Sequence, residues 1–199
     1  EDACQSLGSS YNGVVAGTIG DISTLSFNAN KVVAGISGGG AIITDGDTEI
    51  FKKLRKHGNN EILGYNSKML LFNAKVINHR LNKLDSYIEK RQEIAKQYDE
   101  ALKDFVVVQP NTGGHNYHKY VIRVQNKKLR DKIKDKLGAK VHYDKPLSEN
   151  KMYNNIEHRK DSTYFSKIVS DTVLTLPLHP YMTQGEIDKI INTILIILE

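Results

Sequence analysis

The sequence predicts an α/β chain in which an N-terminal part with short strands is joined by a long helix to a small α+β module. Residues 1–45 are rich in Gly, Ser, Thr and Val, and they contain two short runs with strand character. Apolar residues then recur at helical spacing over residues 68–103. Beyond that helix, stretches of strand and helix character alternate to the C-terminus, which is the pattern of a mixed α/β fold.

The N-terminal part is expected to hold two strands followed by one short helix. The strands are predicted at 24–27 and 41–44, with a Gly-containing turn between them. Asp47 is placed to cap a helix that starts near Thr48, because a short carboxylate accepts hydrogen bonds from the first free N–H groups. Gly58 follows as the expected end of this helix.

The long helix is predicted to run from Lys68 to Lys103. Its buried seam repeats at alternating intervals of four and three residues, which is typical of a heptad pattern. At 1.5 Å per residue it would extend roughly 50 Å, so we expect it to link two domains rather than to serve one. The seam consists of Ile77, Leu81, Leu84, Ile88, Arg91, Ala95, Tyr98 and Leu102.

The C-terminal module is predicted to alternate strands with helices. A Thr183–Glu186 capping box opens a last helix with an apolar stripe. Strands are expected at 105–109, 117–124, 139–143 and 173–176, and a helix at 127–137 closed by Gly138.

Length and composition exclude several classes of protein. A chain of 199 residues makes one large domain or two small ones. Its longest apolar run, 194–198, is far shorter than the ~20 residues that cross a bilayer, so no membrane partner is expected. The single cysteine, Cys4, allows no intrachain disulfide, which fits a cytoplasmic location.

Charge is unevenly distributed along the chain. The net charge is +5, yet the first 50 residues contain one Lys and six acidic residues. A basic remainder can indicate nucleic-acid binding, or it can be the solvated surface of Lys-rich helices. We favour the second interpretation and expect no nucleic-acid partner, because the lysines are scattered among Glu and Asp.

Few residues are candidates for chemistry. The sequence contains neither a P-loop nor a dinucleotide-binding glycine motif, and the pair His115 and His118 lacks companions for a metal site. Lys31 stands out because it is the only basic residue among the first 51. It follows Ser26, at the end of a predicted strand, by five residues.

Seven motifs, in order, carry a resemblance over the whole chain. They are EDACQ at 1–5, GTIGD at 17–21, LSFNANK at 25–31, SGGGAIIT at 37–44, GYNSKM at 64–69, YHKYVIR at 117–123 and LPLHPYMT at 176–183. Together they resemble the DegT/DnrJ/EryC1/StrS family of sugar aminotransferases, which depend on pyridoxal 5'-phosphate (PLP) and have the PLP-dependent transferase fold type I. The chain departs from the family at Lys68, where Arg is usual, and Lys cannot make the bidentate contact of Arg.

The resemblance implies a role for each candidate residue. Lys31 would condense with the PLP aldehyde and move protons during the reaction, and Asp2 would keep the pyridine nitrogen protonated. Gln5 would hydrogen-bond the ring hydroxyl, and Ser26 would hold the phosphate. Asn66 would reach the phosphate of the neighbouring subunit, which implies a homodimer with shared active sites.

The resemblance also implies the reaction and the place of this chain in the enzyme. The reaction would transfer an amino group, with glutamate as the expected donor, to a keto group of a nucleotide-activated sugar. Since family members carry a comparable length before the EDACQ motif, we expect 1–67 to be the end of the PLP-binding large domain and 68–199 the long helix and small domain. The alternative is a truncated or split-gene fragment that is inactive alone, and we expect the 199 residues by themselves to bind PLP poorly.

Overall fold

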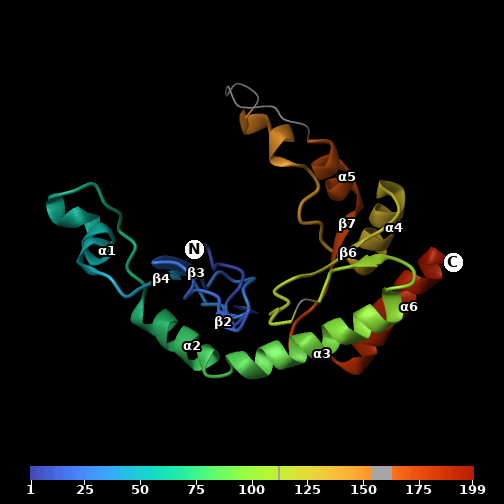
Figure 1. Cartoon of the computed structure of the whole chain (residues 1–199), viewed down its shortest axis with the longest axis horizontal. Helices are drawn as coiled ribbons and strands as arrows, with labels where there is room; N and C mark the ends of the chain where they lie inside the picture. Colours follow the sequence, from blue (N-terminus) through green and yellow to red (C-terminus); the bar gives the residue numbers. More distant parts are fainter. Residues whose placement is uncertain (112, 154–162) are drawn as a thin grey trace. The chain divides into compact units, whose positions relative to one another are not determined.

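The computed structural model describes residues 1–111, 113–153 and 163–199, and it divides the chain into two units. The first comprises Glu1–Glu89 with Thr112–His118, and the second comprises Lys90–Asn111 with Lys119–Glu199. Figure 1 shows the order of helices and strands along the chain. Among the described residues, no helix combines the length and the apolar character needed to cross a membrane.

The first unit is built on two antiparallel strands, which confirms both predicted strands. Strands β3 (Ile22–Ser26) and β4 (Gly40–Thr44) pair along their whole length, with Ser26 opposite Gly40. The N-terminal segment adds a parallel bridge between Asp2 and Thr24 of β3. The remaining elements are β1 (Ser10–Tyr11), β2 (Val14–Val15), α1 (Glu49–Leu54), the 3-10 segment η1 (His57–Asn60) and α2 (Leu71–Leu81).

A small apolar core lies beneath the loop that follows β3. Phe27 and Val33 from this loop are buried together with Ile77 of α2. Several partly exposed side chains pack around them: Leu7, Leu25, Ala41, Met69, Leu81 and Leu84. The loop that carries Lys31 is therefore anchored by apolar residues on either side of that lysine.

The short helix α1 starts where the sequence predicts but ends earlier. The Asp47 side chain accepts a 2.8 Å hydrogen bond from the Glu49 N–H. The predicted end at Gly58 is wrong, because the last α1 residue is Leu54. The Leu54 carbonyl accepts a hydrogen bond of 2.7 Å from the N–H of Tyr65, so a returning segment caps this end of the helix.

The predicted single helix over 68–103 is wrong, because two helices occupy this range. Helix α2 ends at Leu81, and α3 runs over Leu84–Leu102. The Asn82 N–H donates to the Asn78 carbonyl, and the Lys83 N–H then donates to the Arg80 carbonyl in a turn that separates the two helices. Asn is a poor helix former, which favours a break there. Within α3 the expected seam holds, and its buried members include Arg91, Ala95, Tyr98 and Leu102.

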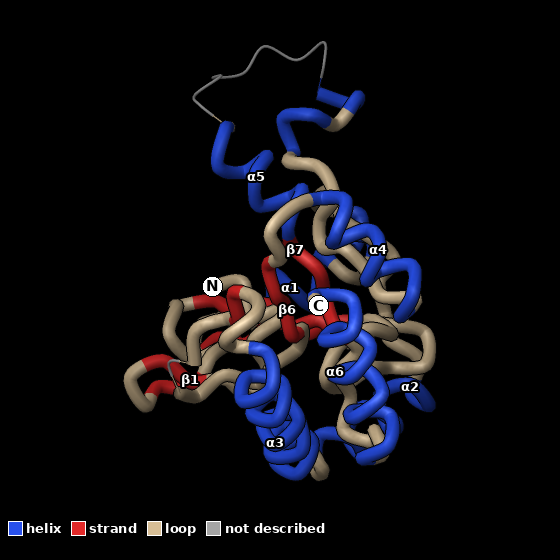
Figure 2. The backbone as a smooth tube through the Cα atoms, turned by 90° about the vertical axis from the view of Figure 1, so that its right-hand side faces the viewer, coloured by secondary structure: helices blue, strands red, loops and turns tan. Residues whose placement is uncertain are grey.

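The second unit contains a three-stranded antiparallel sheet in the order β5–β6–β7. Figure 2 shows β6 and β7 side by side, with α4 near them. The strands are β5 (Val107–Val108), β6 (Tyr120–Arg123) and β7 (Val173–Leu176). The helical elements are α4 (Lys127–Leu137), η2 (Leu147–Glu149), η3 (Lys151–Tyr153), α5 (Tyr164–Thr172) and α6 (Gln184–Leu198).

Elements with local signals in this unit agree with the sequence. Helix α4 spans the predicted residues and ends at Gly138 in the left-handed conformation, with φ 60°. The capping box between Thr183 and Glu186 is present at the start of α6. Strand β7 also has its predicted bounds, and all four of its residues are buried.

Three other expectations for this unit need correction. The strands predicted at 105–109 and 117–124 are shorter than expected, and Tyr117 cannot extend β6 because its φ is +45°. No strand forms at 139–143, where only Lys140 pairs with Thr175 before the chain turns. The sequence reading also missed α5.

Side chains from the sheet and from the three helices α3, α4 and α6 form the core of the second unit. The rings of Tyr98 in α3 and Tyr120 in β6 lie with centroids 5.1 Å apart. The Tyr98 hydroxyl donates a hydrogen bond of 2.8 Å to the Pro177 carbonyl. The largest fully buried side chains here are Tyr98, Leu102, Tyr120, Ile122, Ile133, Leu174, Leu176 and Ile194.

Candidate active site

A small cavity in the first unit brings three of the predicted site residues together. Gln5, Ser26 and Lys31 all line it. Its other lining residues are Cys4, Leu7, Val32, Val33, Asn116 and His118. The amine, the hydroxyl and the amide that the sequence singles out therefore share one site.

Lys31 stands on a tight loop that closes on the end of β3. The Lys31 N–H donates to the Asn28 carbonyl at 2.9 Å, which makes the first turn of the loop. The Gly35 N–H donates to Phe27 at 2.7 Å and brings the chain back to its starting point. The Lys31 side chain is half-buried, and within the described residues its amine makes no hydrogen bond or ion pair. No hydrogen bond to the described residues therefore has to break before the amine reacts or binds an anion.

The Asp2 carboxylate is held in its ionised form. Hydrogen bonds from Cys4, first from its side chain and then from its backbone N–H, lower the pKa of Asp2 below its usual value, and the positive charge of Lys31 lowers it further. The bond from the Cys4 N–H measures 3.0 Å. An ionised carboxylate close to Lys31 can pair with a protonated ring nitrogen.

Asn116 belongs to this site, although the sequence analysis did not single it out. It is buried, and its side-chain amide donates to the carbonyls of Gln5 and Leu7, both at 3.0 Å. Its carbonyl oxygen accepts from the His118 N–H at 2.9 Å. One amide thus ties the segment that carries Gln5 to a segment more than 100 residues later. The sequence feature that could have pointed to Asn116 is its position directly before the YHKYVIR motif.

The two histidines considered for a metal site, His115 and His118, have different surroundings. His118 lines the cavity, whereas the His115 ring accepts a hydrogen bond from the Tyr117 N–H at 2.7 Å. Burial lowers the pKa of His115, which favours its neutral form. No cluster of three or more metal-ligating side chains occurs in the described part of the chain.

Asn66 lies apart from this cavity within the first unit. It forms an isolated antiparallel bridge with Lys56, between α1 and α2. Its neighbour Ser67 donates its N–H to the Arg55 carbonyl at 3.2 Å. The structure therefore does not bring Asn66 to the Lys31 of its own chain.

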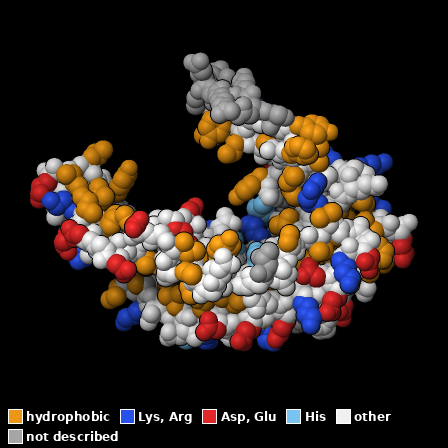
Figure 3. All heavy atoms as spheres, viewed as in Figure 1, with side chains coloured by type: hydrophobic (Ala, Val, Ile, Leu, Met, Phe, Trp, Pro, Cys, Tyr) orange, Lys and Arg blue, Asp and Glu red, His pale blue; other side chains and the backbone are white. Residues whose placement is uncertain are grey.

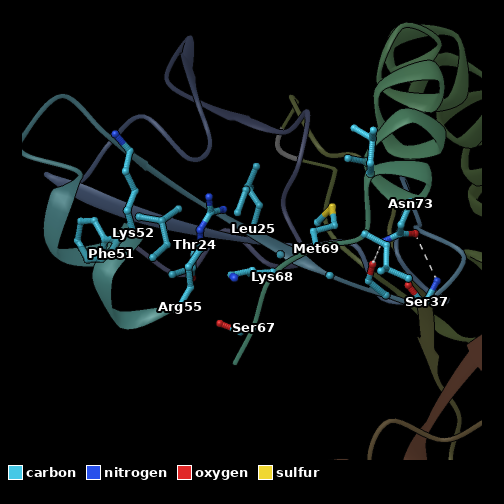
Figure 4. Close-up of a pocket in the computed structure, with 18 of the residues that line it drawn as sticks. Thr24, Leu25, Ser37, Phe51, Lys52, Arg55, Ser67, Lys68, Met69 and Asn73 are labelled. Atoms are coloured by element: carbon cyan, nitrogen blue, oxygen red, sulfur yellow. Dashed lines mark hydrogen bonds between the residues drawn. The ribbon is translucent and has the colours of Figure 1, made fainter. Parts of the chain in front are cut away.

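A second, larger cavity of about 980 Å³ lies between the β3–β4 pair, α1 and the start of α2. Figure 4 shows Lys52, Arg55 and Lys68 on its wall. At one end of the cavity Asn73 is hydrogen-bonded to the glycine-rich segment 37–40. Its lining residues include these three cations and no carboxylate. Hydrophobic side chains lie exposed around α1 on the same unit (Figure 3), Ile50 among them.

Two curated relatives match nearly the whole chain. A protein described as a pleiotropic regulatory protein from Geobacillus stearothermophilus is 28% identical over 209 residues, covering 98% of this chain and 56% of that protein. A dTDP-3-amino-3,6-dideoxy-alpha-D-galactopyranose transaminase from Aneurinibacillus thermoaerophilus is 28% identical over 207 residues, covering 98% and 56%. The chain thus spans a little over half the length of these relatives.

Two solved structures share the fold. A DegT DnrJ EryC1 StrS aminotransferase from Brucella abortus is 30% identical with a TM-score of 0.88, covering 98% of this chain and 56% of that one. A putative sugar aminotransferase from Streptococcus pneumoniae in its PLP-form is 25% identical with a TM-score of 0.87, covering 99% and 56%.

The model of one protein family also matches nearly the whole chain. It covers residues 1–195 and describes the DegT/DnrJ/EryC1/StrS aminotransferase family. The motifs that meet at the cavity, around Gln5, Ser26 and Lys31, lie inside this range. The chain belongs to the DegT/DnrJ/EryC1/StrS aminotransferase family.

Proposed function

We propose that this chain is part of a PLP-dependent aminotransferase. The enzyme transfers an amino group from an amino acid, with glutamate as the proposed donor, to a keto group of a nucleotide-activated sugar. The observation that carries the proposal is the meeting of Lys31, Ser26 and Gln5 at one cavity, with the ionised Asp2 near Lys31. The transaminase named among the relatives supports the sugar substrate.

The residues present fit PLP. The Lys31 amine makes no hydrogen bond to the described residues, and the Asp2 carboxylate interacts with its charge without a direct contact between the two groups. The lowered pKa of Asp2 keeps a negative charge where a protonated ring nitrogen needs a partner. When bound, PLP supplies an electron sink for the carbon that exchanges the amino group.

Each residue of the chain then has a distinct task. Lys31 would hold the cofactor through its amine and, once released from that bond, would act as the base that takes up and returns a proton. Asp2 would keep the ring nitrogen protonated, Gln5 would hydrogen-bond the ring hydroxyl, and Ser26 would donate to the phosphate. The Ser26 hydroxyl accepts from the Asn28 N–H at 3.4 Å, which leaves its own proton to donate.

Asn66 completes the site of a second subunit in this proposal. It lies apart from the Lys31 cavity of its own chain, as expected of a residue that acts across an interface. The active form is then a cytoplasmic homodimer. Residues 1–67 belong to its PLP-binding large domain, and residues 68–199 form the linking helices and the small domain.

The alternative is a fragment that keeps these elements but has no activity of its own. It is favoured by one observation, since the chain spans just over half the length of its relatives. The active enzyme and the inactive fragment differ in how strongly they bind PLP. A fragment alone lacks further phosphate donors and a partner for the ring face, so it binds PLP weakly.

The test is to add PLP to the intact protein, reduce with borohydride and map the labelled peptide. We expect the pyridoxyl group on Lys31, with no label in Lys31→Ala and full label in Lys75→Ala, a control on an exposed lysine of the same unit. Label on another lysine contradicts the site. The same experiment on residues 1–199 alone separates the two alternatives, because a fragment gives little label.

A further inference from the structure

We propose that Asn73 of α2 is a positioning residue for Lys31. It fixes the far end of the loop that carries the lysine, and so determines where the amine stands. The inference rests on the proposed role of Lys31 and adds a residue that acts through it. The argument depends on the loop, on the bonds of Asn73 and on the face of α2.

The loop from Phe27 to Gly39 is closed at its base by backbone hydrogen bonds. The Phe27 N–H donates to the Gly39 carbonyl at 2.8 Å, and the Gly35 N–H donates to the Phe27 carbonyl at 2.7 Å. Lys31 lies within the loop that these hydrogen bonds close. Its backbone position therefore depends on where residues 34–39 are held.

The Asn73 side chain holds that segment through three backbone groups. Its oxygen Oδ1 accepts from the Ile36 N–H at 2.7 Å and from the Ser37 N–H at 3.3 Å. Its nitrogen Nδ2 donates to the Gly38 carbonyl at 2.7 Å. Figure 4 shows Asn73 and Ser37 facing each other, with the bonds from Asn73 to Ser37 and Gly38 drawn as dashed lines. Asn73 is 3% exposed, so water does not compete with the bonds.

An amide is suited to this task because it both accepts and donates. A carboxylate of the same size accepts but cannot donate to Gly38, and an apolar residue does neither. The fit is also close, since a Cβ added at Gly35 would lie 2.6 Å from the Asn73 oxygen. The loop therefore passes directly against this side chain.

One face of α2 supports the same contact over about two helical turns. Asn73, Ile77 and Arg80 stand at helical intervals of four and three, which places them on one side of the helix. Ile77 packs on Phe27 and Val33 of the loop, and Arg80 donates a hydrogen bond to the Ala34 carbonyl. Asn73 is thus one of several contacts that hold the loop against α2, and the one that reaches Gly38.

The test compares Asn73→Ala with Asn78→Ala, a substitution of the same residue type at an exposed position of the same helix. Two reactions at Lys31 are measured by mass spectrometry in the intact protein. PLP trapping with borohydride needs an oriented amine, whereas reductive methylation with formaldehyde needs only an accessible one. Amide hydrogen exchange over residues 33–40 reports on the loop itself.

We expect Asn73→Ala, which removes all three bonds, to lower the initial rate of PLP trapping at Lys31 by roughly tenfold, a factor that corresponds to the net free energy of about one hydrogen bond. Methylation of Lys31 stays the same or rises, exchange over 33–40 becomes faster, and Asn78→Ala behaves as wild type. If Asn73→Ala fails to fold, Asn73→Asp takes its place, because it keeps an acceptor for the Ile36 and Ser37 N–H groups but sets a carboxylate oxygen against the Gly38 carbonyl. We expect a loss of trapping from it as well.

Unchanged PLP trapping in a folded Asn73 variant whose loop exchanges faster overturns the inference. An unchanged exchange rate in Asn73→Ala overturns it as well, since the loop is then held by other contacts. Equal losses in both Lys31 reactions also count against it, because they indicate general damage instead of lost orientation. Failure of the proposed function is distinguishable from all of these, because wild type then shows no PLP trapping at Lys31.

Discussion

The side-chain amide of Asn116 donates a 3.0 Å hydrogen bond to the backbone carbonyl of Gln5, 111 residues earlier in the chain. The same amide donates to Leu7 at 3.0 Å. These bonds fix the segment that carries Gln5, and both Gln5 and Asn116 line the cavity around Lys31. A residue outside the proposed cofactor contacts therefore shapes the site.

Replacing Asn116 by Ala is expected to destabilise the first unit by about 2 kcal/mol, because two backbone carbonyls and the His118 N–H lose a buried partner. Native-state hydrogen exchange of the β3 amides measures this free energy. Asn78→Ala is the control, since Asn78 is exposed. A loss below about 0.5 kcal/mol would show that water replaces the amide.

The Asp2→Asn variant is expected to lower kcat/KM on the order of 100-fold, because a neutral amide cannot stabilise a protonated ring nitrogen through a charge-assisted bond. Steady-state kinetics on the intact enzyme gives the value. Asp21→Asn, at an exposed acidic residue of the same unit, should retain full activity. Wild-type kinetics in Asp2→Asn would assign the ring nitrogen to another partner.

Mixed dimers test whether Asn66 acts across the subunit interface. Lys31→Ala and Asn66→Ala homodimers should both be inactive. In a heterodimer of the two variants, one site combines an intact Lys31 with an intact Asn66, so up to about half of the wild-type activity per dimer should return. The measurement is activity after purification of doubly tagged heterodimers. No recovery in verified heterodimers would place Asn66 in its own subunit's site.

The capping box of α6 gives a stability prediction for the second unit. Thr183→Ala removes the side-chain acceptor of the Glu186 N–H and should cost about 1 kcal/mol. Thr193→Ala on the same helix should change stability by less than about 0.5 kcal/mol, because its hydroxyl bonds only the Lys189 carbonyl within the helix. Hydrogen exchange of the α6 amides compares the two, and equal effects would mean that the cap contributes little.

The close approach at Gly35 gives a steric prediction. A methyl group there would lie 2.5 Å from the Gly38 carbonyl oxygen, so Gly35→Ala should destabilise the first unit by about 1–3 kcal/mol. Gly185→Ala is the control, because no atom beyond its chain neighbours and the backbone of its own helix lies within 4 Å of the added carbon. Exchange rates of the 33–40 amides provide the measurement. Wild-type rates in Gly35→Ala would show that the loop can shift without cost.

Elements with a local cause were predictable from the sequence. Gly138 ends α4 because it adopts a left-handed conformation, and the Thr183–Glu186 box bonds within one turn. The end of α1 was not predictable in the same way, because the Leu54 carbonyl is capped by the N–H of Tyr65 from a returning segment. The break between α2 and α3 was equally hard to predict from local sequence, because α2 belongs to the first unit and most of α3 belongs to the second.

The family and the types of chemical group available could be predicted from the amino-acid order alone, because the motifs around Asp2, Gln5, Ser26 and Lys31 are short, continuous segments that occur in a fixed order. Only the tertiary structure placed three of these residues at one cavity and showed what holds them there. Asn116 and Asn73 escaped the sequence analysis because their partners are mainly backbone groups of distant segments. Any residue type offers such a group, so a contact of this kind leaves no pattern in the sequence and exists only after the chain has folded.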